Sequence, residues 1–147
     1  MPDDDQLDQR IIAALRDDSR ISNADLATRM GLSASSCWRR VRALEDAGVI
    51  RRYTVDVNDA AMGLAFKAIV HVQMTRHDRG MVKDFVRMIR TKDEVRACYA
   101  TTGGSDYHLH VVCPDLDAYN RFLEDFLFTI PAVASAQTHL VLRTIKD

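Results

Sequence analysis

The chain has 147 residues and a formal net charge of −1, with 47% hydrophobic and 28% charged residues. This composition is ordinary for a soluble globular protein long enough to bury a core. No run approaches the roughly 20 apolar residues of a membrane span, and the start MPDDD lacks the cationic head of a secretion signal, so we expect a cytoplasmic protein with no membrane partner.

The three cysteines, Cys37, Cys98 and Cys113, are odd in number and widely spaced. This spacing argues against a disulfide framework or a CxxC metal site. Each lies in an apolar pattern, so we expect three buried thiols and favour them over reactive ones.

The first predicted helix spans residues 6–16, with Leu7, Ile11 and Ala14 on one face. A second begins at Ser22, where Asp25 completes a capping-box pattern. Gly31 ends this helix, because glycine accepts the left-handed backbone conformation that follows a helix. The sequence therefore predicts two helices joined to a third by a sharp turn.

The third predicted helix begins at Ser33 and ends near Gly48, with Cys37, Val41 and Leu44 spaced to face the preceding helix. Two short helices joined by a turn form a helix-turn-helix, whose second helix enters the DNA major groove. Similar helix pairs occur in folds that never meet DNA, so this pattern by itself leaves DNA binding open.

Charge placement favours DNA binding. Between residues 39 and 52, five arginines face only two carboxylates, a local excess of three positive charges. The Trp38 indole can contact a sugar or a thymine methyl, or it can pack at the edge of the helical core. Arg51 and Arg52 lie on a predicted exit strand, where contact with phosphates and exposure to solvent are about equally plausible. The residues assigned to DNA contact are Ser33, Ser35, Ser36, Trp38, Arg39, Arg40, Arg42, Arg51 and Arg52.

The stretch LDQRIIAALRDDSRISNADLATRMGLSASSCWRRVRALEDAGVIRRYTVDVN resembles the DNA-binding domain of the Lrp/AsnC (feast/famine) transcriptional regulators. The similarity runs through the turn LS, the helix CWRRVRALE and the exit GVI…Y, and it continues over nearly the whole chain. It implies a regulator that binds double-stranded DNA.

The remaining segments alternate strand and helix patterns in the order βαββαβ, which is the ferredoxin-like arrangement. The predicted fold class is α+β: a winged-helix-like helix-turn-helix domain and a ferredoxin-like sandwich. The predicted boundaries are 1–53 for the DNA-binding domain, 54–63 for a linker strand and 64–147 for the effector-binding and oligomerisation domain. The predicted strand and helix segments of the last domain are 64–74, 79–90, 94–101, 107–113, 115–128 and 133–145.

In this topology both helices cover one face of the sheet and leave the other face open. Phe66, Ala68 and Val70 are apolar on one side of the first strand, but Ala65 and Ile69 are apolar on the other. We therefore expect the open face to bury against a second copy. The family resemblance likewise implies a homodimer formed through such sheets, often assembled into an octamer.

The turn TTGGSDYH, residues 101–108, combines glycines, hydroxyl donors and one carboxylate. Consecutive N–H groups in such a turn can hold a ligand carboxylate, although GGSD is also an ordinary hairpin turn. The resemblance implies an amino-acid effector pocket with a G-x-x-D loop, matched by Gly103 and Asp106, although some family members act without an effector. The neighbours carried over with them are Thr101, Thr102, Gly104, Ser105 and Tyr107, together with Gln137 and Thr138 of the last strand.

His108 and His110 lie at i and i+2 on one predicted strand, and His71 or His139 could join them as a metal site. Carboxylate or cysteine partners at metal-ligand spacing are absent from the sequence, so we favour surface or interface histidines and expect no metal or other cofactor beyond the effector.

The leading hypothesis is a transcriptional regulator whose DNA binding or assembly responds to a small amino acid. An effector-independent architectural protein that bends DNA is the alternative. A third reading, in which the C-terminal domain is an enzyme, lacks a nucleophile–base pair, paired carboxylates or a phosphate-binding glycine loop. We therefore expect no enzymatic activity.

Overall fold

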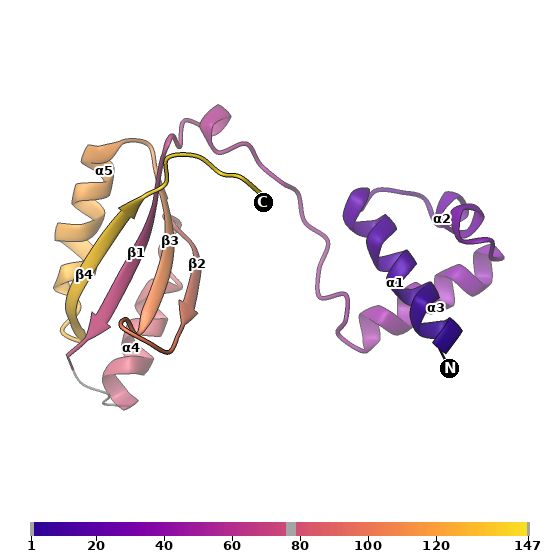
Figure 1. The fold of residues 1–147 in the computed structure, drawn as a ribbon, viewed down its shortest axis with the longest axis horizontal. Helices are drawn as coiled ribbons and strands as arrows, with labels where there is room; N and C mark the ends of the chain where they lie inside the picture. Colours follow the sequence, from indigo (N-terminus) through magenta and orange to yellow (C-terminus); the bar gives the residue numbers. More distant parts are fainter. Residues whose placement is uncertain (1, 76–78, 147) are drawn as a thin grey trace. The chain divides into compact units, whose positions relative to one another are not determined.

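The computed structural model describes residues 2–75 and 79–146, and the chain divides into two compact units, Met1–Asp56 and Val57–Asp147 (Figure 1). The division falls inside the segment predicted to be the linker. No helix of the described residues is both long and apolar enough to cross a bilayer.

The N-terminal unit consists of α1 (Pro2–Asp17), α2 (Asn23–Met30) and α3 (Ala34–Asp46). The predicted start of α2 is confirmed, because the Ser22 hydroxyl accepts a bond from the backbone N–H of Asp25 at 3.1 Å. The same hydroxyl donates to the Asp25 carboxylate at 2.6 Å. This side-chain bond takes the place of the backbone N–H bond that completes an ordinary capping box.

The turn between α2 and α3 has a fixed geometry. Gly31 has φ +72°, as predicted, and the N–H of Leu32 donates to the carbonyl of Ala27 at 2.9 Å. A second link crosses the turn, where the Asn23 amide Nδ2 donates to the carbonyl of Ala34 at 2.9 Å. The first bond joins the turn to the end of α2, and the second joins the start of α2 to the start of α3. Together they hold α3 in its orientation within this unit.

One apolar cluster holds the three helices together. Each helix contributes to it from its predicted face, and Leu7, Val41 and other half-buried residues pack around its rim. The buried members of the cluster are Ile11, Ala14, Leu26, Ala27, Met30, Cys37 and Leu44. The core of a helix-turn-helix is thus complete within this unit.

The prediction of a strand after α3 is wrong. Residues 49–58 contain no strand, and the short 3₁₀ helix η1 (Ala60–Met62) follows. Val55 is 77% exposed and Val57 is 51% exposed, so the alternating pattern is present but nothing covers its apolar side. A strand needs a neighbour to receive its hydrogen bonds, and none of the described strands pairs with this segment.

Asp59 fastens the segment before the sheet to the sheet itself. Its carboxylate lies 2.8 Å from Lys67 Nζ and 3.7 Å from a guanidinium nitrogen of Arg96. The hydrogen bond from Lys67 holds the pKa of Asp59 below its ordinary value of 3.8, and the charge of Arg96 acts in the same direction. The ionised carboxylate therefore stabilises the C-terminal unit.

We expect Asp59→Asn to lower the free energy of unfolding of the C-terminal unit by about 1 kcal/mol at neutral pH, because these partners are partly exposed. The pKa is lowered in the folded state, so this contribution is complete above pH 3.8 and is lost as the pH falls below it. Thermal unfolding followed by circular dichroism measures the difference. Asp93→Asn, at an exposed turn, is the control; an equal loss in both variants would contradict the role given to Asp59.

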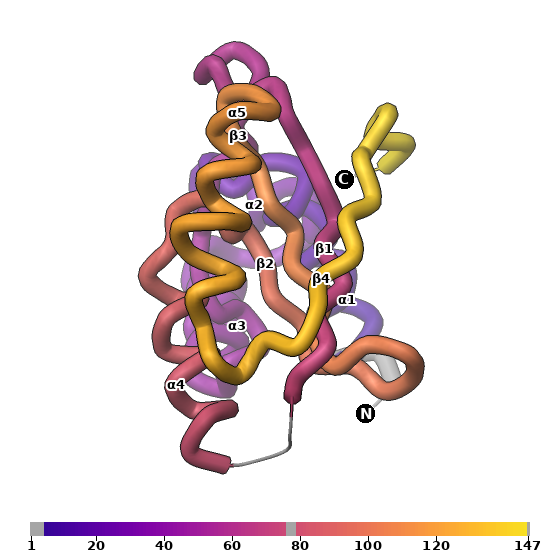
Figure 2. The backbone as a smooth tube through the Cα atoms, turned by 90° about the vertical axis from the view of Figure 1, so that its left-hand side faces the viewer, coloured from indigo at the N-terminus to yellow at the C-terminus, as the bar shows by residue number. Residues whose placement is uncertain are grey.

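The C-terminal unit is a four-stranded antiparallel sheet with strand order β2-β3-β1-β4, and the helices that follow the first strand lie on one side of it (Figure 2). The predicted ferredoxin-like βαββαβ order is confirmed. The elements are β1 (Phe66–Met74), α4 (Arg79–Ile89), β2 (Val95–Ala100), β3 (Tyr107–Cys113), α5 (Leu116–Arg121) and β4 (Val133–Leu140).

The two faces of the sheet differ in burial. Ala68, Val70 and Val72 of β1 face the helices and are inaccessible to solvent, together with Phe85 of α4. On the other face of β1, Ile69 is 40% exposed. The face away from the helices is called the open face below.

Two predicted elements differ from expectation, one in its type of helix and the other in its length. The predicted helix 115–128 becomes π-helical at η2 (Phe122–Phe126) and 3₁₀-helical at η3 (Leu127–Thr129) after α5. The wider turn buries Phe122, Phe126 and Leu127 against the sheet, whereas Leu116, predicted to face the core, is 56% exposed. Strand β4 ends at Leu140 rather than at residue 145.

The expectation for the cysteines holds for two of the three. Cys37 and Cys113 are buried, and burial raises the pKa of both thiols. Cys98 is exposed, because β2 is an edge strand and no helix covers this position fully. Desolvation nevertheless raises the pKa of the Cys98 thiol, so it is a weak nucleophile at neutral pH.

Candidate nucleic-acid interface and effector loop

Helix α3 presents one exposed stripe opposite its buried face. Ser35, Trp38, Arg39 and Arg42 follow one another at helical spacing, and all four are exposed. Trp38 is 59% exposed, so most of the indole lies outside the helical core. A stripe that begins with a hydroxyl near the helix N-terminus and continues with guanidinium groups matches the side chains that read base edges and phosphates.

The Ser33 hydroxyl has a structural role at the start of α3. It accepts a bond from the backbone N–H of Ser36 at 3.2 Å and lies 3.2 Å from the Ser35 hydroxyl. Ser36 is half-buried, whereas Ser33 and Ser35 are exposed. Of the three predicted serines, Ser35 is therefore the one placed on the stripe.

The predicted arginines have different surroundings. Arg40 lies between the stripe and the core, and its guanidinium is 2.9 Å from the carboxylate of Asp8 on α1. This pair fastens α3 to α1, a role that sequence patterns did not show. Arg39, Arg51 and Arg52 are exposed and form no ion pair with any residue in the described part of the chain.

Arg42 is held by neighbours on its own helix. Its guanidinium lies 3.2 Å from the Glu45 carboxylate and 4.0 Å from that of Asp46. The hydroxyl of Tyr53 donates to the other oxygen of Glu45 at 2.9 Å. Burial is the main cause that raises the pKa of Tyr53, and the hydrogen bond to Glu45 raises it further. The hydroxyl therefore stays protonated and keeps Glu45 in place.

We expect Glu45→Gln to strengthen non-specific DNA binding, because it removes the charge that neutralises Arg42 and leaves an amide oxygen for Tyr53. If Arg42 then contacts a phosphate, a plot of log affinity against log salt concentration should steepen by up to about 0.9. Fluorescence anisotropy on a random duplex at several salt concentrations measures this slope. Glu124→Gln, at an exposed position of the other unit, is the control, and an unchanged slope would place Arg42 away from phosphates.

The loop between β2 and β3 is held by its own backbone and by β1. The N–H of Thr101 donates to the carbonyl of Asp106 at 3.0 Å, and the Thr101 hydroxyl donates to the carbonyl of Ser105 at 3.2 Å. Gly103 has φ +118°, where a side chain is strained, although a Cβ there would have no atom within 4 Å. Backbone conformation, and not crowding, accounts for this glycine.

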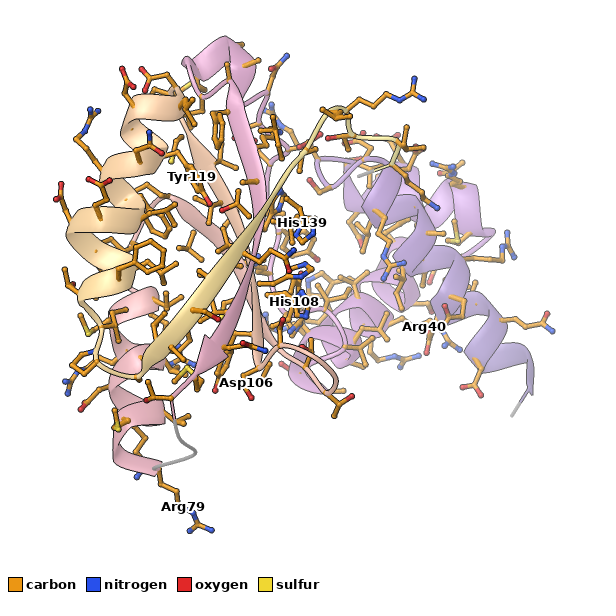
Figure 3. All side chains as sticks on the ribbon, turned by 60° about the vertical axis from the view of Figure 1, so that its left-hand side comes forward. Arg40, Arg79, Asp106, His108, Tyr119 and His139 are labelled. Atoms are coloured by element: carbon orange, nitrogen blue, oxygen red, sulfur yellow. The ribbon has the colours of Figure 1, made fainter. Side chains whose placement is uncertain are left out.

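Asp106 joins the loop to the end of β1. Its backbone N–H donates to the carbonyl of Val72 at 2.9 Å, and its carboxylate accepts a bond from the backbone N–H of Met74 at 2.8 Å. Figure 3 shows Asp106 at the end of the sheet that carries the loop. One carboxylate oxygen is thus already engaged with the protein backbone.

Sequence reasoning missed two residues that support the loop. The Gln73 amide Nε2 donates to the carbonyl of Gly104 at 2.7 Å, and the Ser135 hydroxyl donates to Gln73 Oε1 at 3.0 Å. This chain of bonds connects β4, β1 and the loop on the open side of the sheet. No local motif marks Gln73 or Ser135, because only the strand register brings them together.

The predicted effector residues do not form one cluster. Thr101, Thr102, Gly103, Gly104, Ser105 and Asp106 form the loop, and Gln137 lies on the open face opposite His71. Thr138 points to the helix face, where it shares a short hydrogen bond with the Tyr119 hydroxyl. Tyr107 also faces the helices, with its ring 4.7 Å from that of Phe85.

A cavity of about 500 Å³ opens between α4 and β2 on the helix side. Ala100 and Tyr107, which flank the loop, form part of its wall, so the loop and the cavity meet at these two residues. The remaining walls are Val86, Ile89, Arg90, Val95, Arg96, Ala97 and Cys98.

Two family models match the chain. A winged helix-turn-helix DNA-binding model covers residues 4–51, and a model of the Lrp/AsnC ligand binding domain covers residues 67–147. The chain belongs to the Lrp/AsnC family. The resemblance inferred from the sequence is confirmed, and the α3 stripe and the 101–106 loop lie in the two domains that these models describe.

Relatives of this Lrp/AsnC protein are transcriptional regulators. It is 38% identical to the HTH-type transcriptional regulator AldR of Mycolicibacterium smegmatis, over 97% of this chain and 83% of the relative. It is 32% identical to the leucine-responsive regulatory protein of Escherichia coli, over 97% and 87%. A transcriptional regulator from Neisseria meningitidis, solved in complex with L-methionine, superposes with a TM-score of 0.91 at 34% identity, over 96% of this chain and 91% of that one.

Proposed function

We propose that this Lrp/AsnC protein is a cytoplasmic transcriptional regulator without enzymatic activity, which binds specific DNA sequences through α3 and responds to a small amino acid through the 101–106 loop. Two copies pair through the open face, so that two α3 helices enter successive major grooves of a roughly palindromic operator. Four such pairs form an octamer.

The exposed stripe of α3 carries this proposal. Arg39 projects from the helix without an ion pair in the described residues, next to the exposed Trp38 and Ser35. The chain as a whole has a net charge of −1, so the cations gathered here serve a local purpose. Double-stranded DNA suits this stripe, because its phosphates are anionic and its major groove admits a single α-helix.

Selection of duplexes from a random pool, followed by sequencing, tests DNA recognition. We expect a roughly palindromic motif with half-sites about one helical turn apart. Enrichment of no motif, with equal affinity for all duplexes, would favour an architectural protein that bends DNA.

The effector response has separate support. A neighbour of this structure, the feast or famine regulatory protein of M. tuberculosis, was solved in complex with L-methionine and superposes with a TM-score of 0.88 at 29% identity, over 97% of this chain and 95% of that one. Glycines, hydroxyls and a carboxylate lie together in the 101–106 loop of this chain. Calorimetry against each of the twenty amino acids identifies the effector, and silence from all of them would again favour the architectural alternative.

A further inference from the structure

Three histidine side chains lie side by side on the open face. His71 of β1 is directly opposite His108 of β3, and their ring centroids are 4.2 Å apart. His139 of β4 lies on the other side of His71, with ring centroids 4.3 Å apart. Figure 3 shows His108 and His139 on the side of the sheet away from Tyr119. These three residues are called the histidine triplet.

Both positive and negative side chains lie near the triplet. At one end of the face, Lys67 and Arg96 share the carboxylate of Asp59, and Asp106 lies at the loop end. His110 also faces this side, near Asp59, which responds to its charge. Tyr99 of β2 pairs with His108 and also faces this side. Within the described residues, no carboxylate forms an ion pair with any ring of the triplet.

Protonation of His71 is unfavourable even in the single chain. Burial lowers the pKa of His71 below its ordinary value of 6.5, and the charges of His108 and His139 lower it further. A second copy on this face would remove more water from the rings and strengthen the first cause. Two-fold pairing would also bring two triplets into one interface, because both copies use the same surface.

We propose that the histidine triplet makes the pairing of two copies sensitive to pH, with neutral rings allowing the pair to form and protonated rings separating it. This inference rests on the proposed pairing through the open face. With neutral rings, the face exposes the large hydrophobic side chains Ile69 and Tyr99, which suits a second copy of the same face. Protonation adds uncompensated positive charge from the triplet of each copy.

Pairing of two copies and proton binding at the triplet are linked equilibria. The paired state binds fewer protons at the triplet than the separate copies do. The pair is therefore most stable above the His71 pKa of a separate copy, which lies below the ordinary value of 6.5, and it weakens as the pH falls through that lowered pKa. One ring that must stay neutral weakens the pair about tenfold at one pH unit below its free pKa. Each copy contributes at least His71, so the expected change is about a hundredfold.

Sedimentation velocity of the full chain at about pH 7.5, above the ordinary imidazole pKa, and at about pH 5, well below it, tests the proposal. We expect pairs or larger assemblies at the higher pH and single copies at the lower pH. The triple variant His71→Gln/His108→Gln/His139→Gln should stay assembled at both. The matched control His110→Gln, on the same face but beside Asp59, should keep the pH response of the unaltered chain.

The outcomes separate this inference from the pairing itself. Unaltered protein that stays assembled at about pH 5, or a triple variant that still separates there, would overturn the histidine proposal and leave the pairing intact. Single copies at pH 7.5 would overturn the proposed pairing, and this inference with it. Circular dichroism at both pH values checks that the fold is retained.

Discussion

Replacing Arg39 by alanine is expected to weaken binding to the selected operator by about 1 to 3 kcal/mol, roughly five- to 150-fold, and to relax base preference at one position. Arg39 should have the largest effect of the arginines on α3. Arg42 is neutralised by Glu45 and Asp46, and Arg40 is bonded to Asp8. Only Arg39 combines exposure on the stripe with a guanidinium that has no ion pair in the described residues.

Affinity measured on a panel of duplexes, each altered at one base pair of the operator, resolves the role of Arg39. A loss confined to one base pair identifies a base contact. Equal weakening on every duplex would reassign Arg39 to a phosphate. Arg121→Ala, which removes an exposed arginine from α5 in the other unit, controls for the change of net charge.

Replacing Asp106 by alanine is expected to abolish the response to the amino-acid effector and to leave operator binding by the effector-free protein unchanged. The Asp106 carboxylate fixes the loop to the backbone of β1 through Met74, so alanine would release the loop. Operator affinity with and without the effector measures the response. A variant that still responds would move the effector site elsewhere.

Asp106→Asn separates two roles of this side chain. Asparagine keeps an oxygen that can accept the bond from Met74, but it removes the charge that could pair with a ligand ammonium. Because the structure engages the carboxylate with Met74, we expect the asparagine variant to retain most of the response. Loss of the response in both variants would show that the charge itself is required.

The helices of the N-terminal unit could be predicted from the sequence because their signals are local. Ser22, Gly31 and Ser33 act on backbone groups within a few residues, and each is found with the predicted conformation or cap. The predicted strand after α3 failed for the opposite reason. Its alternating pattern is local, but a strand also needs a partner, and no described strand pairs with it.

The surroundings of the candidate site residues were not predictable in the same way. The sequence placed Arg39, Arg40 and Arg42 together as cations, but their partners differ because one of them reaches α1. Thr138 and Gln137 are adjacent in sequence, yet they lie on opposite faces of the sheet because side chains alternate along a strand. The position of a strand in its sheet decides which neighbour reaches a ligand.

Of the three cysteines, only Cys98 is accessible to solvent, and it forms part of the wall of the cavity beside the effector loop. A thiol-reactive fluorophore can therefore be attached there without any substitution, provided that the labelling pH is raised to offset the raised pKa of this thiol. The unaltered chain thus has a natural attachment point for an optical reporter next to the loop that we propose binds an amino acid.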